Sequence, residues 1–186
     1  MYDTKHFYST ALICEGGHIL CTNLEKYPEQ NIPYCPKCHE PCISKCPHCG
    51  APIHGDFMGI AYPHSTYLNA RGYVPSEYPE KRVLCIQPIN EPPAFCYNCS
   101  SPYPWTKQLL EEAEKIVDLM DDLTEEQKNT LKGCFPDLIT DTIKTTTSAL
   151  TVEKILRSVS RIPVTALQNI LYTKLTDTAL TFLGWK

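Results

Sequence analysis

The sequence YCPKCHEPCISKCPHCGAP at residues 34–52 contains two C-x-x-C pairs, Cys35/Cys38 and Cys46/Cys49. Two cysteines separated by two residues can both reach one tetrahedral metal ion, so each pair indicates half of a zinc site. In each pair a proline follows the first cysteine; it fixes φ and needs no amide hydrogen bond, while the remaining amides can point at sulfur. The stretch therefore predicts metal binding.

Two further pairs of candidate ligands lie far from this stretch. Cys96 and Cys99 form a third C-x-x-C pair in AFCYNCSSPYPW, and Cys14 and His18 form a C-x-x-x-H pair in ICEGGHIL. The two glycines between Cys14 and His18 permit positive φ, so the backbone there can fold tightly around a metal. This pattern is weak on its own, and Cys21 is the alternative ligand if His18 does not bind.

The pairs can combine in more than one way. If the two pairs of residues 34–52 shared one ion, only seven residues would connect them, which leaves little room for the hairpin of a zinc ribbon. Sequential pairing uses every pair and predicts two zinc ions, the first held by Cys14, His18, Cys35 and Cys38 and the second by Cys46, Cys49, Cys96 and Cys99. We prefer this pairing. A site with four protein ligands is closed and structural, and each such zinc can contribute about 10–16 kcal/mol of binding energy coupled to folding.

The number and setting of the cysteines also indicate a compartment. There are eleven, an odd number, and the first residues lack the basic start and apolar run of a signal peptide. These features favour a reducing cytoplasm and metal thiolates over a disulfide framework. A redox-active C-x-x-C usually begins a helix in a βαβ unit, and no such pattern is present. No run approaches the roughly 18 apolar residues of a membrane helix, so no transmembrane segment is expected.

Composition changes abruptly after the last C-x-x-C pair, which predicts two domains in an α+β protein. Residues 1–104 are expected to form two small β zinc-ribbon modules with a long β and loop insertion at 51–93. Residues 105–186 are expected to form an α-helical domain of about four helices. Thr124–Gln127 is a capping-box pattern that opens a short helix ended by Gly133 or Pro136. The Thr- and Ser-rich residues 140–151 indicate a linker or irregular turn, and a last helix is expected to start near Pro163 and end near Gly184.

Net charge argues against a broad electrostatic grip on nucleic acid. The chain carries −4 at neutral pH, whereas nucleic-acid binders normally show a basic surplus. One local exception is the insertion, where Arg71, Lys81 and Arg82 alternate with tyrosines that could stack on bases. The plainer interpretation, which we favour, is tyrosine packing against proline in a small β layer.

At these motifs the chain resembles an uncharacterised bacterial zinc-ribbon family, catalogued as a domain of unknown function. The matching stretches are ICEGGHI, YCPKCHEPCISKCPHCGAPIHGD and AFCYNCSSPYPWT running into an acidic helix. The resemblance covers the first 106 residues well and the helical tail loosely, and it implies the same eight ligands. His39 and Ser100 depart from the glycine that commonly follows such a pair. The resemblance implies metal and fold, with no activity to carry over.

Three functional hypotheses follow. We favour a zinc-binding, non-catalytic interaction or adaptor protein, with a protein partner or self-association through the helical region. The alternative is a nucleic-acid-binding zinc-ribbon protein using Arg71, Lys81 and Arg82. An enzyme is disfavoured, because the chain has no P-loop, G-x-S-x-G, H-E-x-x-H or deaminase H-x-E pattern.

Overall fold

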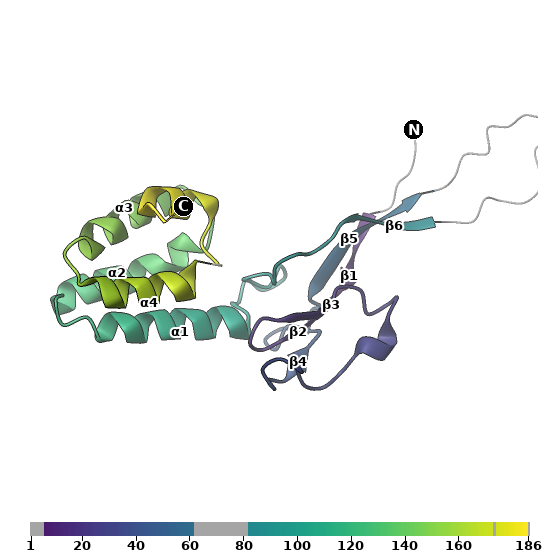
Figure 1. Ribbon diagram of the computed structural model, residues 1–186. Coiled ribbons are helices and arrows are strands. Elements are labelled where there is room, and N and C mark those ends of the chain that lie inside the picture. The colour runs from purple at the N-terminus through teal and green to yellow at the C-terminus, as the bar shows by residue number, and fades with distance from the viewer. Residues whose placement is uncertain (1–5, 62–81, 173, 186) are drawn as a thin grey trace, which may run out of the picture. The chain divides into compact units, whose positions relative to one another are not determined.

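Among the residues that the structure describes, small antiparallel sheets form in the first half of the chain and five α-helices in the second, which confirms the predicted α+β class (Figure 1). The structure, a computed structural model, describes residues 6–61, 82–172 and 174–185. The chain divides into two compact units, Met1–Ser101 and Pro102–Lys186. This division falls three residues before the boundary at 104/105 that composition predicts.

The described residues of the first unit form two three-stranded antiparallel sheets. One sheet has the order β1-β5-β6, with strands β1 (His6–Thr10), β5 (His54–Ala61) and β6 (Arg82–Gln87). The other has the order β3-β2-β4, with strands β2 (Leu12–Cys14), β3 (Ile19–Cys21) and β4 (Cys42–Ile43). A single 3₁₀ turn, η1 (Pro28–Gln30), lies in the connection between β3 and β4. The described ends of the predicted insertion, β5 and β6, are strands; its residues 62–81 lie outside the described part.

The core of the first unit is small and rich in sulfur. The central strand β2 is buried along its whole length, and Ala11 and Ile53 extend its core. Among the described residues of this unit, five of the eleven buried apolar residues are cysteines. Because so few aliphatic side chains are buried, the hydrophobic effect stabilises this unit weakly, and a further source of stability is needed.

The second unit is a set of five packed helices with an aliphatic and aromatic core. They are α1 (Pro104–Asp118), α2 (Glu125–Leu138), α3 (Thr145–Leu156), α4 (Arg161–Leu171) and α5 (Asp177–Leu183). Helix α1 packs against α2 and α4, and α3 packs against α2 and α5. Val117, Leu131, Phe135, Val152 and Leu167 are fully buried between them. No described helix is both long enough and apolar enough to cross a membrane.

Helix α2 begins where the sequence predicts and ends later. Thr124 Oγ1 accepts a hydrogen bond from the Gln127 amide (3.3 Å) and Gln127 Oε1 accepts one from the Thr124 amide (2.9 Å), so the capping box is confirmed. The predicted end at Gly133 or Pro136 is wrong, because the helix continues to Leu138. A proline inside a helix costs about 3 kcal/mol. Burying Phe135 and Leu138 offsets this, since each contributes about 1.5–3 kcal/mol.

The Thr- and Ser-rich stretch is not a linker, because α3 begins inside it. Thr145 Oγ1 donates to the Thr140 carbonyl (2.6 Å) and accepts from the Thr142 amide (2.9 Å). Ser148 Oγ donates to the Asp137 carboxylate (2.8 Å). These hydroxyls are buried at little cost because each has a hydrogen-bond partner. Helix formation then brings Val152 into the core.

The predicted last helix is interrupted. Helix α4 ends at Leu171, and α5 starts after Thr176, whose Oγ1 accepts a hydrogen bond from the Ala179 amide (3.1 Å). The predicted end near Gly184 is confirmed, since this glycine closes α5 with a φ of 68°. A threonine before an aspartate is an ordinary N-cap signal, so the break was present in the sequence but outweighed by the apolar periodicity.

Candidate metal centres

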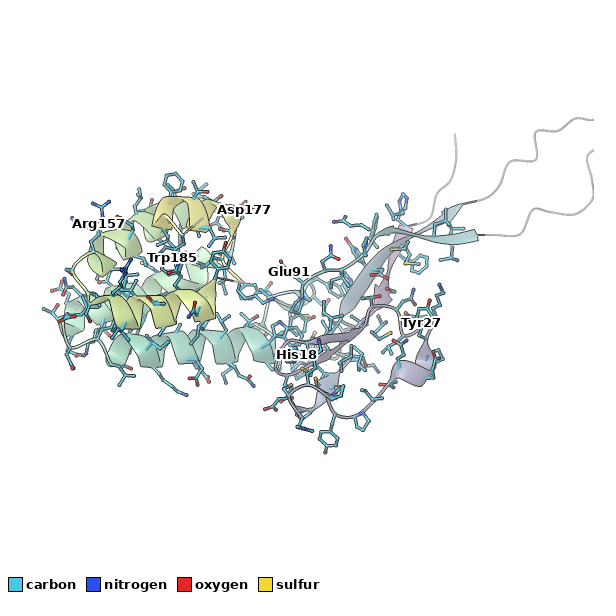
Figure 2. The ribbon with its side chains drawn as sticks, viewed as in Figure 1. His18, Tyr27, Glu91, Arg157, Asp177 and Trp185 are labelled. Atoms are coloured by element: carbon cyan, nitrogen blue, oxygen red, sulfur yellow. The ribbon has the colours of Figure 1, made fainter. Side chains whose placement is uncertain are left out.

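The first candidate centre joins the end of β2, the turn after it and the 35–38 segment. Cys14, His18, Cys35 and Cys38 each offer one ligand atom, and these four atoms lie within 4.8 Å of one another. Cys14 Sγ is 3.4 Å from His18 Nδ1 and 3.6 Å from Cys38 Sγ, and Cys35 Sγ is 3.7 Å from His18 Nδ1. Around a tetrahedral zinc, two thiolates lie about 3.8 Å apart and a thiolate and an imidazole nitrogen about 3.6 Å apart. The donor set therefore fits one tetrahedral ion (Figure 2 labels His18).

The turn between β2 and β3 places Cys14 and His18 together. The Cys14 amide donates to the His18 carbonyl (3.1 Å), and the His18 amide donates to Cys14 Sγ (3.2 Å). Gly17 has a φ of 86°, a conformation that side chains rarely adopt. A Cβ on Gly16 would lie 3.3 Å from Cys38 Sγ, so this glycine leaves room for sulfur. Each glycine of the motif thus has its own structural role.

The second candidate centre joins segments that are about fifty residues apart in sequence. Cys46, Cys49, Cys96 and Cys99 offer four sulfur atoms within 4.8 Å of one another. The Cys46 and Cys99 sulfurs lie 3.8 Å apart, and those of Cys49 and Cys96 lie 3.7 Å apart. Both separations match the edge of a tetrahedron of thiolates around zinc.

The three C-x-x-C segments share one hydrogen-bonding pattern. The amide of the first cysteine donates to the carbonyl five residues later in all three: Cys35 to Glu40 (2.9 Å), Cys46 to Ala51 (2.7 Å) and Cys96 to Ser101 (2.9 Å). The carbonyl of the first cysteine accepts from the residue after the second cysteine: His39 (2.8 Å), Gly50 (2.9 Å) and Ser100 (2.9 Å). The amides of Lys37 and Asn98 also point at the sulfurs of Cys35 and Cys96, each at 3.4 Å. A repeated backbone geometry therefore presents each pair of sulfurs.

The residue after each second cysteine has a left-handed conformation. Its φ is 62° at His39, 74° at Gly50 and 56° at Ser100. Only glycine adopts this region freely, and other residues pay about 1–2 kcal/mol there. His39 and Ser100 therefore keep the geometry of a glycine-containing segment at some cost in stability.

The thiols of the two clusters differ in acidity. Burial raises the pKa of Cys14 and of Cys46 to about 11. Burial acts the same way on Cys96, but the Asn98 and Cys99 amides and the Cys49 and Cys46 thiols outweigh it and lower its pKa to about 6. Thiols less than 4 Å apart cannot all ionise without a cation between them. A divalent ion would supply that charge, and its binding would release protons.

The structure brings all eight predicted ligands into the two clusters and leaves Cys21 out. Cys21 is buried, and its Sγ accepts a hydrogen bond from the Asn23 amide at 3.4 Å. Arg71 and Lys81 lie outside the described residues, and Arg82 is described only as the first backbone position of β6. Nucleic-acid binding through these three residues stays a prediction.

The sequence did not indicate two contacts made by the residues between Cys96 and Cys99. Asn98 Nδ2 donates to Cys49 Sγ at 3.5 Å, which adds a hydrogen bond to a cluster sulfur. The Tyr97 ring stacks on His54 (centroids 3.8 Å apart), and His54 stacks on Tyr8 (4.1 Å). Tyr97 and Asn98 occupy the two positions between Cys96 and Cys99. Their place between two predicted ligands is the sequence feature that could have indicated these contacts.

These features define a protein with two candidate metal centres in its first unit, each with four donors from cysteine or histidine. The sequence matches, over residues 7–181, the profile of a family described as "Uncharacterized protein conserved in bacteria (DUF2321)". The chain belongs to this family, which confirms the resemblance seen in its motifs. No curated protein and no solved structure gives a significant match.

Proposed function

We propose that this chain is a zinc-binding, non-catalytic interaction or adaptor protein in which two structural zinc ions hold the first unit together. The supporting observation is that each cluster offers four donor atoms within 4.8 Å of one another. Four protein ligands complete a tetrahedral zinc and leave no position for water or substrate. We therefore assign structural roles to all eight ligands and a catalytic role to none.

Zinc is the metal that this donor chemistry favours. One cluster has three sulfurs and an imidazole nitrogen, and the other has four sulfurs. Soft thiolate donors in tetrahedral sets suit zinc, whereas magnesium and calcium prefer oxygen. None of the eleven cysteines, all of which lie in the described residues, forms a disulfide bond, so we further propose that the protein works in a reducing compartment, the cytoplasm.

The helical unit is the part that we propose meets a partner protein. Ile143, Ile162 and Leu119 are large aliphatic residues on its described surface, with 97, 84 and 75% of their area exposed. A partner protein that covers these side chains would remove their apolar surface from water, which stabilises a complex.

Metal stoichiometry tests the proposed function. Native mass spectrometry of the full chain, purified without chelator, should show two zinc ions. His18→Ala should weaken one of them, because it removes a donor from the first cluster. His48→Ala is the matched control, since this exposed histidine lies between Cys46 and Cys49 but belongs to neither cluster. One ion or none in the wild type, or equal loss in the two variants, would reject the proposal.

A further inference from the structure

The strand β6 forms an exposed apolar edge of the β1-β5-β6 sheet. Val83, Leu84 and Ile86 are 50, 51 and 53% exposed, and Cys85 between them is exposed as well. Successive side chains of a strand point to opposite faces, so β6 presents half-exposed apolar side chains on both faces of the sheet. Residues 83–89, VLCIQPI, contain no charged residue. Proteins usually protect an edge strand with charges or a covering segment, because its free backbone groups can pair with another strand.

The opposite edge of the same sheet is closed at its Thr10 end by the chain itself. The Thr10 amide of β1 donates to the Glu25 carboxylate (2.9 Å), and the Thr10 carbonyl accepts from the Leu24 amide (2.9 Å). The register of β1 is also irregular between Tyr8 and Thr10. The segment at Leu24 and Glu25 and the irregular register thus protect the Thr10 end of β1. Among the described residues, β6 pairs with β5 and has no such cover.

An edge strand that pairs with its own copy favours an assembly that closes after two copies. If both edges were open, successive copies could add to the sheet without limit. A second copy that pairs through its own β6 uses up the β6 edge of both molecules, and because Thr10 blocks one end of the described β1 edge, the sheet ends at six strands. Because residues 83–89 are uncharged, the new pair of strands places no like charges opposite each other.

The structure of β6 selects one register for such a pair. Its pairing with β5 is regular from Arg82 to Cys85 and shifts beyond Cys85. In an antiparallel pair, side chains that lie directly opposite each other are on the same face of the sheet. When a two-fold axis relates two copies of one strand, one residue must therefore lie opposite its own copy, and the axis runs between these two residues. An axis at Leu84 sets Leu84 opposite its own copy and Val83 opposite Cys85, all apolar. An axis at Val83 would set Arg82 opposite Leu84, and an axis at Cys85 would use the irregular part.

We propose that the chain forms a two-fold dimer in which β6 pairs antiparallel with β6 of a second copy, centred on Leu84. The new hydrogen bonds satisfy the free backbone groups of the edge, and each copy covers the apolar side chains of the other. This inference goes beyond the proposed function, because it needs no partner protein and involves the first unit rather than the helices. It rests on the proposed function only in that zinc holds the first unit folded.

Charge substitutions at the axis test the dimer. Sedimentation equilibrium of the zinc-loaded full chain in the micromolar range should show a dimer. Leu84→Lys and Leu84→Glu should each raise its dissociation constant by roughly tenfold or more, because each sets two like charges opposite each other. An equimolar mixture of the two variants should dimerise again, since lysine then faces glutamate. Ile162→Lys, at an 84% exposed position of α4, is the control and should leave the dimer unchanged.

The metal content of the same samples, measured by native mass spectrometry, separates this inference from the proposed function. A chain that binds two zinc ions and stays monomeric throughout overturns the dimer alone. A dimer that both Leu84 variants keep, or that Ile162→Lys dissolves, places association elsewhere and also overturns it. A mixture no more dimeric than either variant rejects the Leu84 axis. Loss of zinc in the wild type would instead reject the proposed function.

Discussion

The two units of this protein differ in what fills their interiors. Among the described residues, five of the eleven buried apolar residues of the first unit are cysteines, and none of the nineteen in the second unit is. The second unit therefore has a core that the hydrophobic effect can stabilise, whereas the first has a few aliphatic side chains and two clusters of ligands. Similar chain lengths thus reach stability by different routes, one through apolar packing and the other, as we propose, through metal coordination.

Metal removal should separate the two units most strongly. Because each structural zinc contributes about 10 kcal/mol or more, a strong chelator should unfold the first unit and leave the helices folded. Both tryptophans, Trp105 and Trp185, lie in the second unit, so their fluorescence reports on the helices alone. The expected result is unchanged tryptophan emission together with rapid proteolysis before residue 101. A red shift of the emission at the same chelator concentration would show that the helices also depend on metal.

A core substitution in the second unit should destabilise the helices and leave the first unit and its metal binding unchanged. Phe135 is fully buried in α2, so Phe135→Ala should lower the free energy of unfolding of the helical unit by about 3–5 kcal/mol. Denaturant unfolding followed by tryptophan fluorescence measures this loss. The same variant should still bind two zinc ions, because no ligand belongs to the helices. Reduced zinc content would contradict the separation of the two units.

The smallest expected effects concern Gly50 and Ser100, which follow Cys49 and Cys99 and have a left-handed backbone conformation. Gly50→Ala should weaken zinc binding there by about 1–2 kcal/mol, because alanine is strained at a φ of 74°. No atom lies within 4 Å of an added Cβ, so crowding does not contribute. Ser100→Gly should have the opposite sign and strengthen binding by up to about 1 kcal/mol, since glycine relieves strain but adds freedom to the unfolded chain. Competition with a zinc-binding dye measures both, and effects of equal sign would refute the strain argument.

Much of the candidate site could be predicted because its signals are local. A C-x-x-C pair needs only one turn of backbone, so the spacing of Cys35/Cys38 is already informative in the sequence. Whether His18 or Cys21 joins the first cluster was less certain, because both lie near Cys14. The turn with Gly17 at positive φ brings His18 to the cluster, while β3 directs Cys21 into the core.

The errors in the helical unit arise where burial outweighs local signals. Pro136 usually ends a helix, yet α2 continues because Leu138 is needed in the core. A run of threonines usually avoids helix, yet α3 forms because Thr145 and Ser148 find buried hydrogen-bond partners. Neither partner is visible in a local window, since each lies on a different helix or beyond a turn.

The sequence by itself determined the α+β class, the candidate ligands and the starts of α2 and α4, because these depend on spacing, capping and periodicity over a few residues. Only the tertiary structure decided between the possible pairings of the ligand pairs, and it alone placed Leu24 and Glu25 beside Thr10 of β1 while leaving β6 at the outer edge of its sheet. Those relations join residues tens of positions apart. They depend on how the whole first unit folds, which no local pattern encodes.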